Sequence, residues 1–189
     1  MVAASFLQVT KIMRLISLAA VLVISLLSGC AATVARTDSP TTTIAASPAA
    51  TKSILLEVSP SDKVTTDDNW EAFLEEWQTS MTAAASNKGA SFTLLKAGER
   101  PKQDAAVLVK MKVNDFKYVS QAKRYGMGIF SGNAFMDLDV EFLEYPQGKS
   151  LGTRKFQTTS SAWQGVFSAM TPKQVEAASK EIVEEVAGK

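Results

Sequence analysis

The 189-residue chain contains no histidine and only one cysteine, Cys30. Histidine is the commonest general base in enzymes and the commonest transition-metal ligand, so its absence excludes Ser-His-Asp and Cys-His catalysis. A single cysteine allows neither a disulfide within the chain nor a cysteine-based structural zinc site. Only carboxylate or lysine chemistry remains, and no spacing marks a catalytic pair. The sequence therefore predicts a protein that is not an enzyme and that needs neither a metal nor a dissociable cofactor.

The chain also lacks an excess of charge of either sign. It has 20 basic and 19 acidic residues, a formal net charge of +1. A nucleic-acid-binding protein normally shows a strongly basic surface. Nucleic acid is therefore not an expected partner.

A short apolar run near the N-terminus ends at the cysteine. Lys11 and Arg14 precede residues 15–27, which are almost all Leu, Ile, Val, Ala and Ser. A basic region, an apolar region and then small residues are typical of a secretory signal peptide. The run is shorter than the stretch of about 20 apolar residues that spans a bilayer. We therefore expect a cleaved leader rather than a transmembrane anchor.

The last four residues of this leader, Leu27-Ser28-Gly29-Cys30, resemble the bacterial lipobox. The resemblance implies cleavage between Gly29 and Cys30, diacylglycerol on the Cys30 thiol, and an N-acyl chain such as palmitate on the new amino terminus. Two or more acyl chains anchor a protein stably, whereas one does not. Ala31 stands where aspartate would retain a proteobacterial lipoprotein at the inner membrane. We therefore expect an outer-membrane protein, lipid-anchored at Cys30, that faces the periplasm.

The sequence predicts three segments. Residues 1–29 form the signal peptide. Residues 30–52 form the lipidated cysteine and a flexible Ala/Thr/Ser/Pro tether, which has too few large apolar residues to offset the entropy of ordering. Residues 53–189 form a single α+β domain. Loss of the leader removes Lys11 and Arg14, leaving 160 residues with 18 basic and 19 acidic side chains, enough for one domain with its own core.

Hydrophobic periodicity gives the elements of that domain. Alternating patterns predict strands at 54–58, 91–95, 105–119, 133–145 and 150–159. Apolar spacing predicts one helix from Asp68 to about Ser86, capped by Asp67 or Asp68 with Glu71, and a second helix capped by Thr171 and Gln174. This order predicts an α+β two-layer sandwich with a mainly antiparallel sheet of about five strands and two amphipathic helices.

Three carboxylates, Asp137, Asp139 and Glu141, alternate along one predicted strand. They could bind a hard cation, but same-face neighbours on a strand lie about 7 Å apart, too far for a tight cage. Pairing across strands with Lys110 and Lys112 is the expected arrangement.

Residues 125–132 combine glycine with apolar side chains. A phosphate-binding glycine loop precedes a helix, whereas here a strand is expected to follow, so nucleotide binding is not predicted. Two interpretations stay open: a flexible connection folded onto the domain's own core, or an exposed surface that contacts a partner or a membrane. The candidate contact residues are Tyr125, Met127, Ile129 and Phe130. A smaller apolar cluster, Trp163, Val166 and Phe167, either covers one end of the core or forms a docking patch.

Residues 107–186 resemble the domain-of-unknown-function 4410 family of bacterial lipoproteins. The resemblance is carried by a Val-rich strand ending near Tyr118-Val119-Ser120, by Arg124, by the glycines at 126, 128 and 132, by the Gly148-Lys149 turn and by the C-terminal amphipathic helix. It implies an envelope lipoprotein and transfers no catalytic residue.

Together these features predict a non-enzymatic outer-membrane lipoprotein whose domain is an interaction or assembly module for an envelope protein partner. Two alternatives stay open. One is an inhibitor or immunity-type lipoprotein that binds a toxin or lytic enzyme, and the other is a carrier of a small apolar ligand.

Overall fold

Six strands form one mixed sheet in the computed structural model, which describes residues 34–36, 43–65, 67–159 and 170–188. The strand order across the sheet is β1-β6-β5-β4-β2-β3. The strands are β1 (Val34–Arg36), β2 (Ser53–Pro60), β3 (Ser91–Leu95), β4 (Ala106–Lys117), β5 (Phe135–Tyr145) and β6 (Lys149–Thr159). The helices are α2 (Trp70–Asn87), α3 (Gln121–Met127) and α4 (Thr171–Ala187), with short 3-10 helices η1 (Ala50–Lys52) and η2 (Gly128–Ser131).

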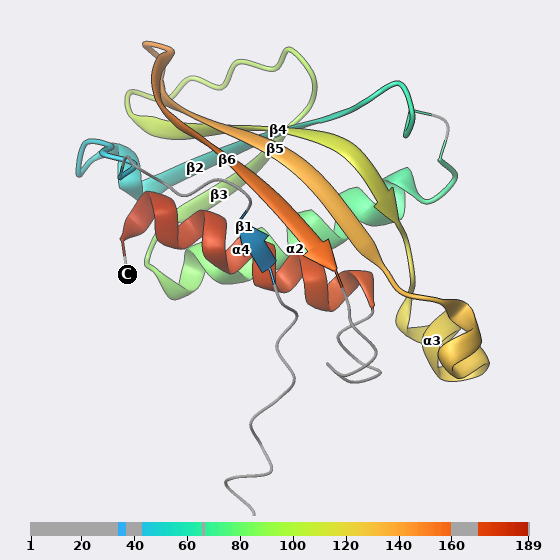
Figure 1. The fold of residues 1–189 in the computed structure, drawn as a ribbon. Coiled ribbons are helices and arrows are strands. Elements are labelled where there is room, and N and C mark those ends of the chain that lie inside the picture. Colours follow the sequence, from blue (N-terminus) through green and yellow to red (C-terminus); the bar gives the residue numbers. More distant parts are fainter. Residues whose placement is uncertain (1–33, 37–42, 66, 160–169, 189) are drawn as a thin grey trace, which may run out of the picture. The chain divides into compact units, whose positions relative to one another are not determined.

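The predicted α+β two-layer fold is confirmed. Helices α2 and α4 pack against the same face of the sheet (Figure 1). The antiparallel meander holds for β4, β5 and β6. Strand β2 instead pairs in parallel with both β3 and β4, because α2 carries the chain back before β3 begins and residues 96–105 carry it back again before β4 begins. The pairing of β4 with β5 shifts register between Val113 and Asp115, as at a β-bulge.

The main core lies between the sheet and the two long helices. The alternation read from the sequence is correct, since every second residue of β4 and β5 is buried there, and so is the apolar face of each helix. The buried residues of β4 and β5 are Val107, Val109, Met111, Val113, Met136, Leu138, Val140 and Phe142; those of the helices include Phe73, Trp77, Met81, Val175, Ala178, Ile182 and Val186.

Helix α2 contributes an aromatic cluster to this core. The ring of Phe73 stacks on that of Phe116 with centroids 4.4 Å apart, and it meets Trp77 edge-on at 6.1 Å. The helix does not begin with the predicted capping box. Its N-cap is Asn69, which makes no side-chain capping bond, while Asp67 Oδ1 accepts the backbone N–H of Asn69 at 2.8 Å.

The cap predicted for α4 is also wrong. Its N-cap is Met170, and neither Thr171 nor Gln174 closes a capping box. Instead Thr171 Oγ1 accepts the backbone N–H of Val119 at 2.8 Å. Gln174 accepts a hydrogen bond from Thr158 Oγ1 at 3.0 Å and donates one to the carbonyl of Ala134 at 2.7 Å. Both side chains are buried, so they satisfy backbone and hydroxyl groups of the sheet that would otherwise lose water without a replacement partner.

A buried ion pair joins β6 to α4. Arg154 lies on the inner face of β6, and its guanidinium donates to Glu185 Oε2 at 2.8 Å. The two side chains are only 4% and 12% exposed. A pair this deep is sensitive to the loss of either partner, because the remaining charge would lose its ion pair where little water can replace it.

Part of the predicted tether is structured. Val34–Arg36 pair antiparallel with β6, Val34 opposite Thr158 and Arg36 opposite Phe156. Ile44 and Ala50 are buried in the main core. Gly152 makes room for Ile44, because a Cβ atom at Gly152 would lie 2.8 Å from Ile44 Cδ1. The prediction of a flexible tether therefore does not hold for these residues.

Candidate functional site

Several predicted sites lie outside the described residues. These are the lipobox positions Gly29 and Cys30 and the cluster Trp163, Val166 and Phe167. Within the part of the chain that the structure describes, no helix is long and apolar enough to cross a membrane.

The connection between β4 and β5 holds the remaining predicted site. The sequence suggested a loop, but the chain forms α3 and then η2, which project beyond the end of the sheet (Figure 1). Gly128 has φ +56°, a backbone conformation that side-chain-bearing residues rarely adopt, at the junction of the two helices. Gly126 lies within α3 and Gly132 follows it, so these glycines do not form a phosphate-binding loop that precedes the helix.

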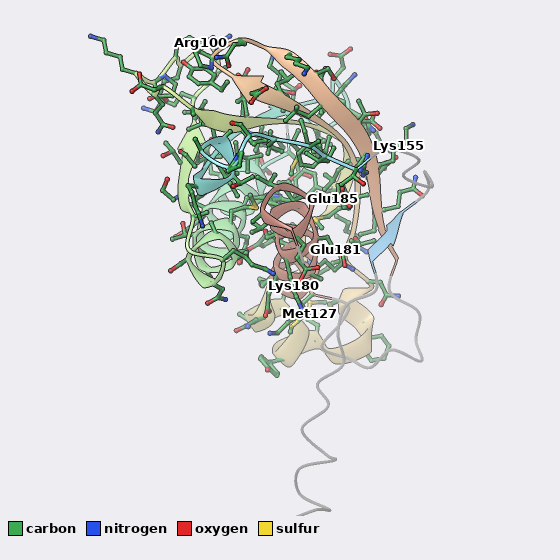
Figure 2. The ribbon with its side chains drawn as sticks, turned by 90° about the vertical axis from the view of Figure 1, so that its left-hand side faces the viewer. Arg100, Met127, Lys155, Lys180, Glu181 and Glu185 are labelled. Carbon is green, nitrogen blue, oxygen red and sulfur yellow. The ribbon has the colours of Figure 1, made fainter. Side chains whose placement is uncertain are left out.

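Three large apolar side chains of this projection face solvent. Tyr125 is 67% exposed, Met127 51% and Phe130 86%. They are called here the α3–η2 apolar surface. Figure 2 places Met127 at the opposite end of the domain from Arg100. The interpretation that this segment folds onto the domain's own core is therefore wrong for these three residues. Ile129 lies in η2, and its side chain is outside the description.

The projection and the strand ends beside it are basic in sequence. Residues 116–136 include Lys117, Lys123 and Arg124 and no aspartate or glutamate. The Lys117 and Lys123 residues are exposed. Apolar side chains and cations thus share one short segment in a chain whose total charge is close to neutral.

Tyr118 ties the base of the projection to α2. Its hydroxyl donates to Glu76 Oε1 at 3.2 Å. Burial raises the pKa of the Tyr118 phenol to about 12, with further contributions from the negative charge and hydrogen bond of Glu76 and from the charge of Glu75. The phenol therefore stays protonated and serves as a hydrogen-bond donor that fixes the exit of β4.

The outer face of the sheet, away from the helices, is divided into two parts. One part is apolar and is covered by the connection between β3 and β4. There the Tyr145 hydroxyl donates to the Pro101 carbonyl at 2.7 Å, and the Ser53 hydroxyl donates to Gln103 Oε1 at 2.7 Å. The apolar residues beneath are Leu55, Leu95, Ala106, Leu108 and Leu143.

The other part of the outer face is an open groove of about 420 Å³. Its charged walls come from Lys110, Lys112, Asp139, Glu141 and Lys155, with Ser59 and Thr153 beside them. The sequence pointed to the first four as facing pairs. It missed Lys155, although the outward half of the β6 alternation carries it.

The register of the sheet confirms that these charges face one another. Lys110 lies opposite Glu141 and Lys112 opposite Asp139. Asp139 also lies 3.5 Å from the Lys155 ammonium and accepts a hydrogen bond from the Asn114 amide at 2.8 Å. Within the described residues no group of three or more acidic, histidine or cysteine side chains could hold a metal ion. The groove is thus a surface of mixed charge.

Comparisons with known proteins give remote structural likenesses only. No protein-family model matches the chain, and no curated protein matches it. The PelC dodecamer from Paraburkholderia phytofirmans aligns at 13% identity over 77% of this chain and 95% of that chain, with a TM-score of 0.40. Protein XCC0632 from Xanthomonas campestris, of family DUF330, aligns at 12% identity over 80% and 90%, with a TM-score of 0.42. A putative neuraminyllactose-binding hemagglutinin homolog from Helicobacter pylori aligns at 12% identity over 72% and 86%, with a TM-score of 0.33. Likenesses of this size carry no inference about function.

Proposed function

We propose that the protein is a non-enzymatic outer-membrane lipoprotein whose periplasmic α+β domain is an interaction or assembly module of the cell envelope. Lipids on Cys30 would hold it at the membrane, as the lipobox resemblance implies. The observation that carries the proposal is the α3–η2 apolar surface. Exposed apolar side chains grouped on one projection are typical of a contact surface for another envelope component.

Folding alone gives no reason for these side chains. Phe130 keeps most of its surface in water, so it gains little of the roughly 1.5–3 kcal/mol that full burial of such a side chain contributes. Phe73 and Trp77, by comparison, are fully buried in the core. A contact outside the domain is the simplest use for the apolar area of the projection.

The alternatives are less well supported. A carrier of a small apolar ligand needs an apolar cavity, whereas the groove on the outer face has lysine and carboxylate walls. The space between α2 and the sheet is occupied by Phe73, Trp77 and Met81, all fully buried. An inhibitor or immunity role gains no specific support from the described residues. The resemblance to the family of unknown function 4410 stays a prediction that agrees with an envelope location.

Two measurements in cells test the proposal. Metabolic labelling with palmitate is expected to mark the wild type and to be lost in Cys30→Ser. A photo-crosslinking amino acid at position 130 is expected to give a discrete adduct with an envelope protein or lipid, while the same amino acid at the exposed turn residue Gln147 gives none. An unlabelled wild type, or equal crosslinking at the two positions, would contradict the proposal.

A further inference from the structure

We infer that the α3–η2 apolar surface docks on the membrane leaflet that holds the lipids of Cys30. The inference rests on the proposed lipidation and names the component that this surface contacts: a lipid bilayer with anionic headgroups, rather than a protein. The domain would then touch the membrane at two places, the acylated N-terminus and the projection. Three features of the fold carry this step.

The first feature is the short chain between the anchor and the sheet. Strand β1 begins at Val34, four residues after Cys30. Four residues span at most about 14 Å even when fully extended. The sheet therefore cannot stand far from the bilayer that holds the acyl chains. A tether running to residue 52 would have allowed a much greater distance.

The second feature is the direction in which β1 enters the sheet. Val34 pairs with Thr158 and Arg36 with Phe156, so the chain enters from the end of the sheet where β6 finishes. Thr158 in turn pairs with Met136 near the start of β5. Neighbouring strands lie about 4.8 Å apart, which puts Val34 within roughly 10 Å of Met136. The anchored end of the chain and the start of β5 therefore share one end of the sheet.

The projection is attached at that same end. Helix η2 finishes at Ser131, four residues before β5 begins at Phe135. Helix α3 follows the end of β4, and the antiparallel register places Lys117 of β4 opposite Phe135. Figure 1 shows α3 beyond this end of the strands and the turn between β5 and β6 at the other end. The apolar surface thus lies at the end of the domain that the lipid anchor draws to the membrane.

The third feature is the chemistry of the segment. Tyr and Phe place an apolar ring and, for Tyr125, a polar hydroxyl at a membrane interface, and Met127 adds flexible apolar area. Lys117 and Lys123 can bind anionic headgroups, and residues 116–136 contain no aspartate or glutamate. Apolar residues of α3 and η2 and exposed lysines of β4 and α3, all at the end of the sheet where the chain enters from Cys30, fit a bilayer surface better than a protein groove.

The test uses the single cysteine of the chain. Once Cys30 is acylated its sulfur is a thioether, so Met127→Cys supplies the only free thiol for an environment-sensitive fluorophore. Purified mature lipoprotein is reconstituted in vesicles of phosphatidylethanolamine and phosphatidylglycerol, and mass spectrometry first establishes the acyl chains. Quenching by spin-labelled lipids then reports depth. Gln147→Cys, on the exposed turn at the far end of the sheet, is the matched control.

A label at 127 is expected to show a blue-shifted emission and strong quenching, as for a group about 5–10 Å below the headgroup surface. The label at 147 is expected to show neither. Adding Tyr125→Ser and Phe130→Ser to Met127→Cys should remove most of the quenching while the circular dichroism spectrum is unchanged. Replacing phosphatidylglycerol by phosphatidylcholine should weaken quenching at 127 only.

The failures can be told apart. A protein without acyl chains would contradict the proposed function whatever the fluorescence shows. An acylated protein with equal, weak quenching at 127 and 147 would overturn the membrane contact and leave the proposed function standing. A blue shift at 127 without lipid quenching, rising with the number of protein molecules per vesicle, would also overturn it, because a second copy of the chain would then cover the surface.

Discussion

Helix α4 and the α3–η2 projection both carry apolar side chains, and they use them in opposite ways. In α4 the apolar residues Val175, Ala178, Ile182 and Val186 are almost completely buried against the sheet and α2. In the projection Tyr125, Met127 and Phe130 are largely exposed. The apolar pattern of α4 is accounted for by folding. Folding does not account for the apolar pattern of the projection, and this pattern therefore points to a contact outside the domain.

The polar residues differ in the same way. On the sheet-facing side of α4, Thr171, Gln174 and Glu185 each bond to the sheet or to the chain leaving it. Such bonds are worth most where water is excluded, since an unpaired group there loses its hydration. The lysines at this end of the sheet, Lys117 of β4 and Lys123 of α3, are exposed and keep their contact with water.

The largest expected effect comes from making the same substitution once in the core, on α2, and once in the projection. Phe73→Ala removes a ring that is fully buried and stacked on Phe116, so the free energy of unfolding should fall by about 3–5 kcal/mol. Phe130→Ala should change it by less than about 0.5 kcal/mol. Denaturant unfolding of the two variants measures the difference. A loss above about 2 kcal/mol for Phe130→Ala would show that the projection contributes to the stability of the core, and it would contradict the difference drawn between buried and exposed apolar residues.

A smaller effect separates buried from exposed charge. Arg154→Ala leaves Glu185 without its buried guanidinium, so we expect a loss of roughly 3 kcal/mol, near the low end for broken buried pairs because Glu185 keeps some exposure. Lys173→Ala, which breaks the exposed pair with Glu176, should cost less than about 0.5 kcal/mol. The double variant Arg154→Leu/Glu185→Leu should recover much of the loss. Equal costs for the two single variants would mean that the Arg154 pair does not support α4.

The smallest expected effect concerns Tyr118, which joins the base of the projection to α2, and it appears only at alkaline pH. The pKa of Tyr118 is raised from 10.0 to about 12, so between these pH values the unfolded chain releases the phenol proton while the folded domain keeps it. The unfolded state then binds fewer protons, and the free energy of unfolding falls as the pH rises. Tyr118→Phe should lose less stability over that interval than the wild type. Parallel curves for the two proteins between pH 10 and 12 would contradict the stated environment of Tyr118.

Much of the domain could be predicted from periodicity. The alternation in β4 and β5 gives their buried faces, since side chains on a strand alternate between its two sides whatever the strand pairs with. The spacing of Phe73, Trp77 and Met81 gives the buried face of α2 for a similar reason. Strand β3 begins and ends where the sequence predicted. These features depend only on the geometry of the local backbone.

Pairing and partner choice could not be predicted in the same way. Nothing within 53–60 specifies that β2 pairs in parallel with β4, because that pairing depends on the paths of α2 and of residues 96–105 between the strands. Thr171 and Gln174 match a capping pattern, yet their side chains bond instead to buried groups in the sheet and at the ends of its strands. The burial of Ile44 depends on the space that Gly152 leaves for it, on a strand that is distant in the sequence.

The sequence by itself determined which residue types this protein lacks and which faces its strands and helices bury, and it predicts a lipid anchor at Cys30. Composition and local periodicity are sufficient for these, because each depends on residues that are neighbours in the chain. Only the tertiary structure decided that Tyr125, Met127 and Phe130 stay in water and that they share one end of the sheet with the entry of the chain at Val34. Exposure and proximity depend on contacts between segments that are far apart in sequence, and no local pattern contains them.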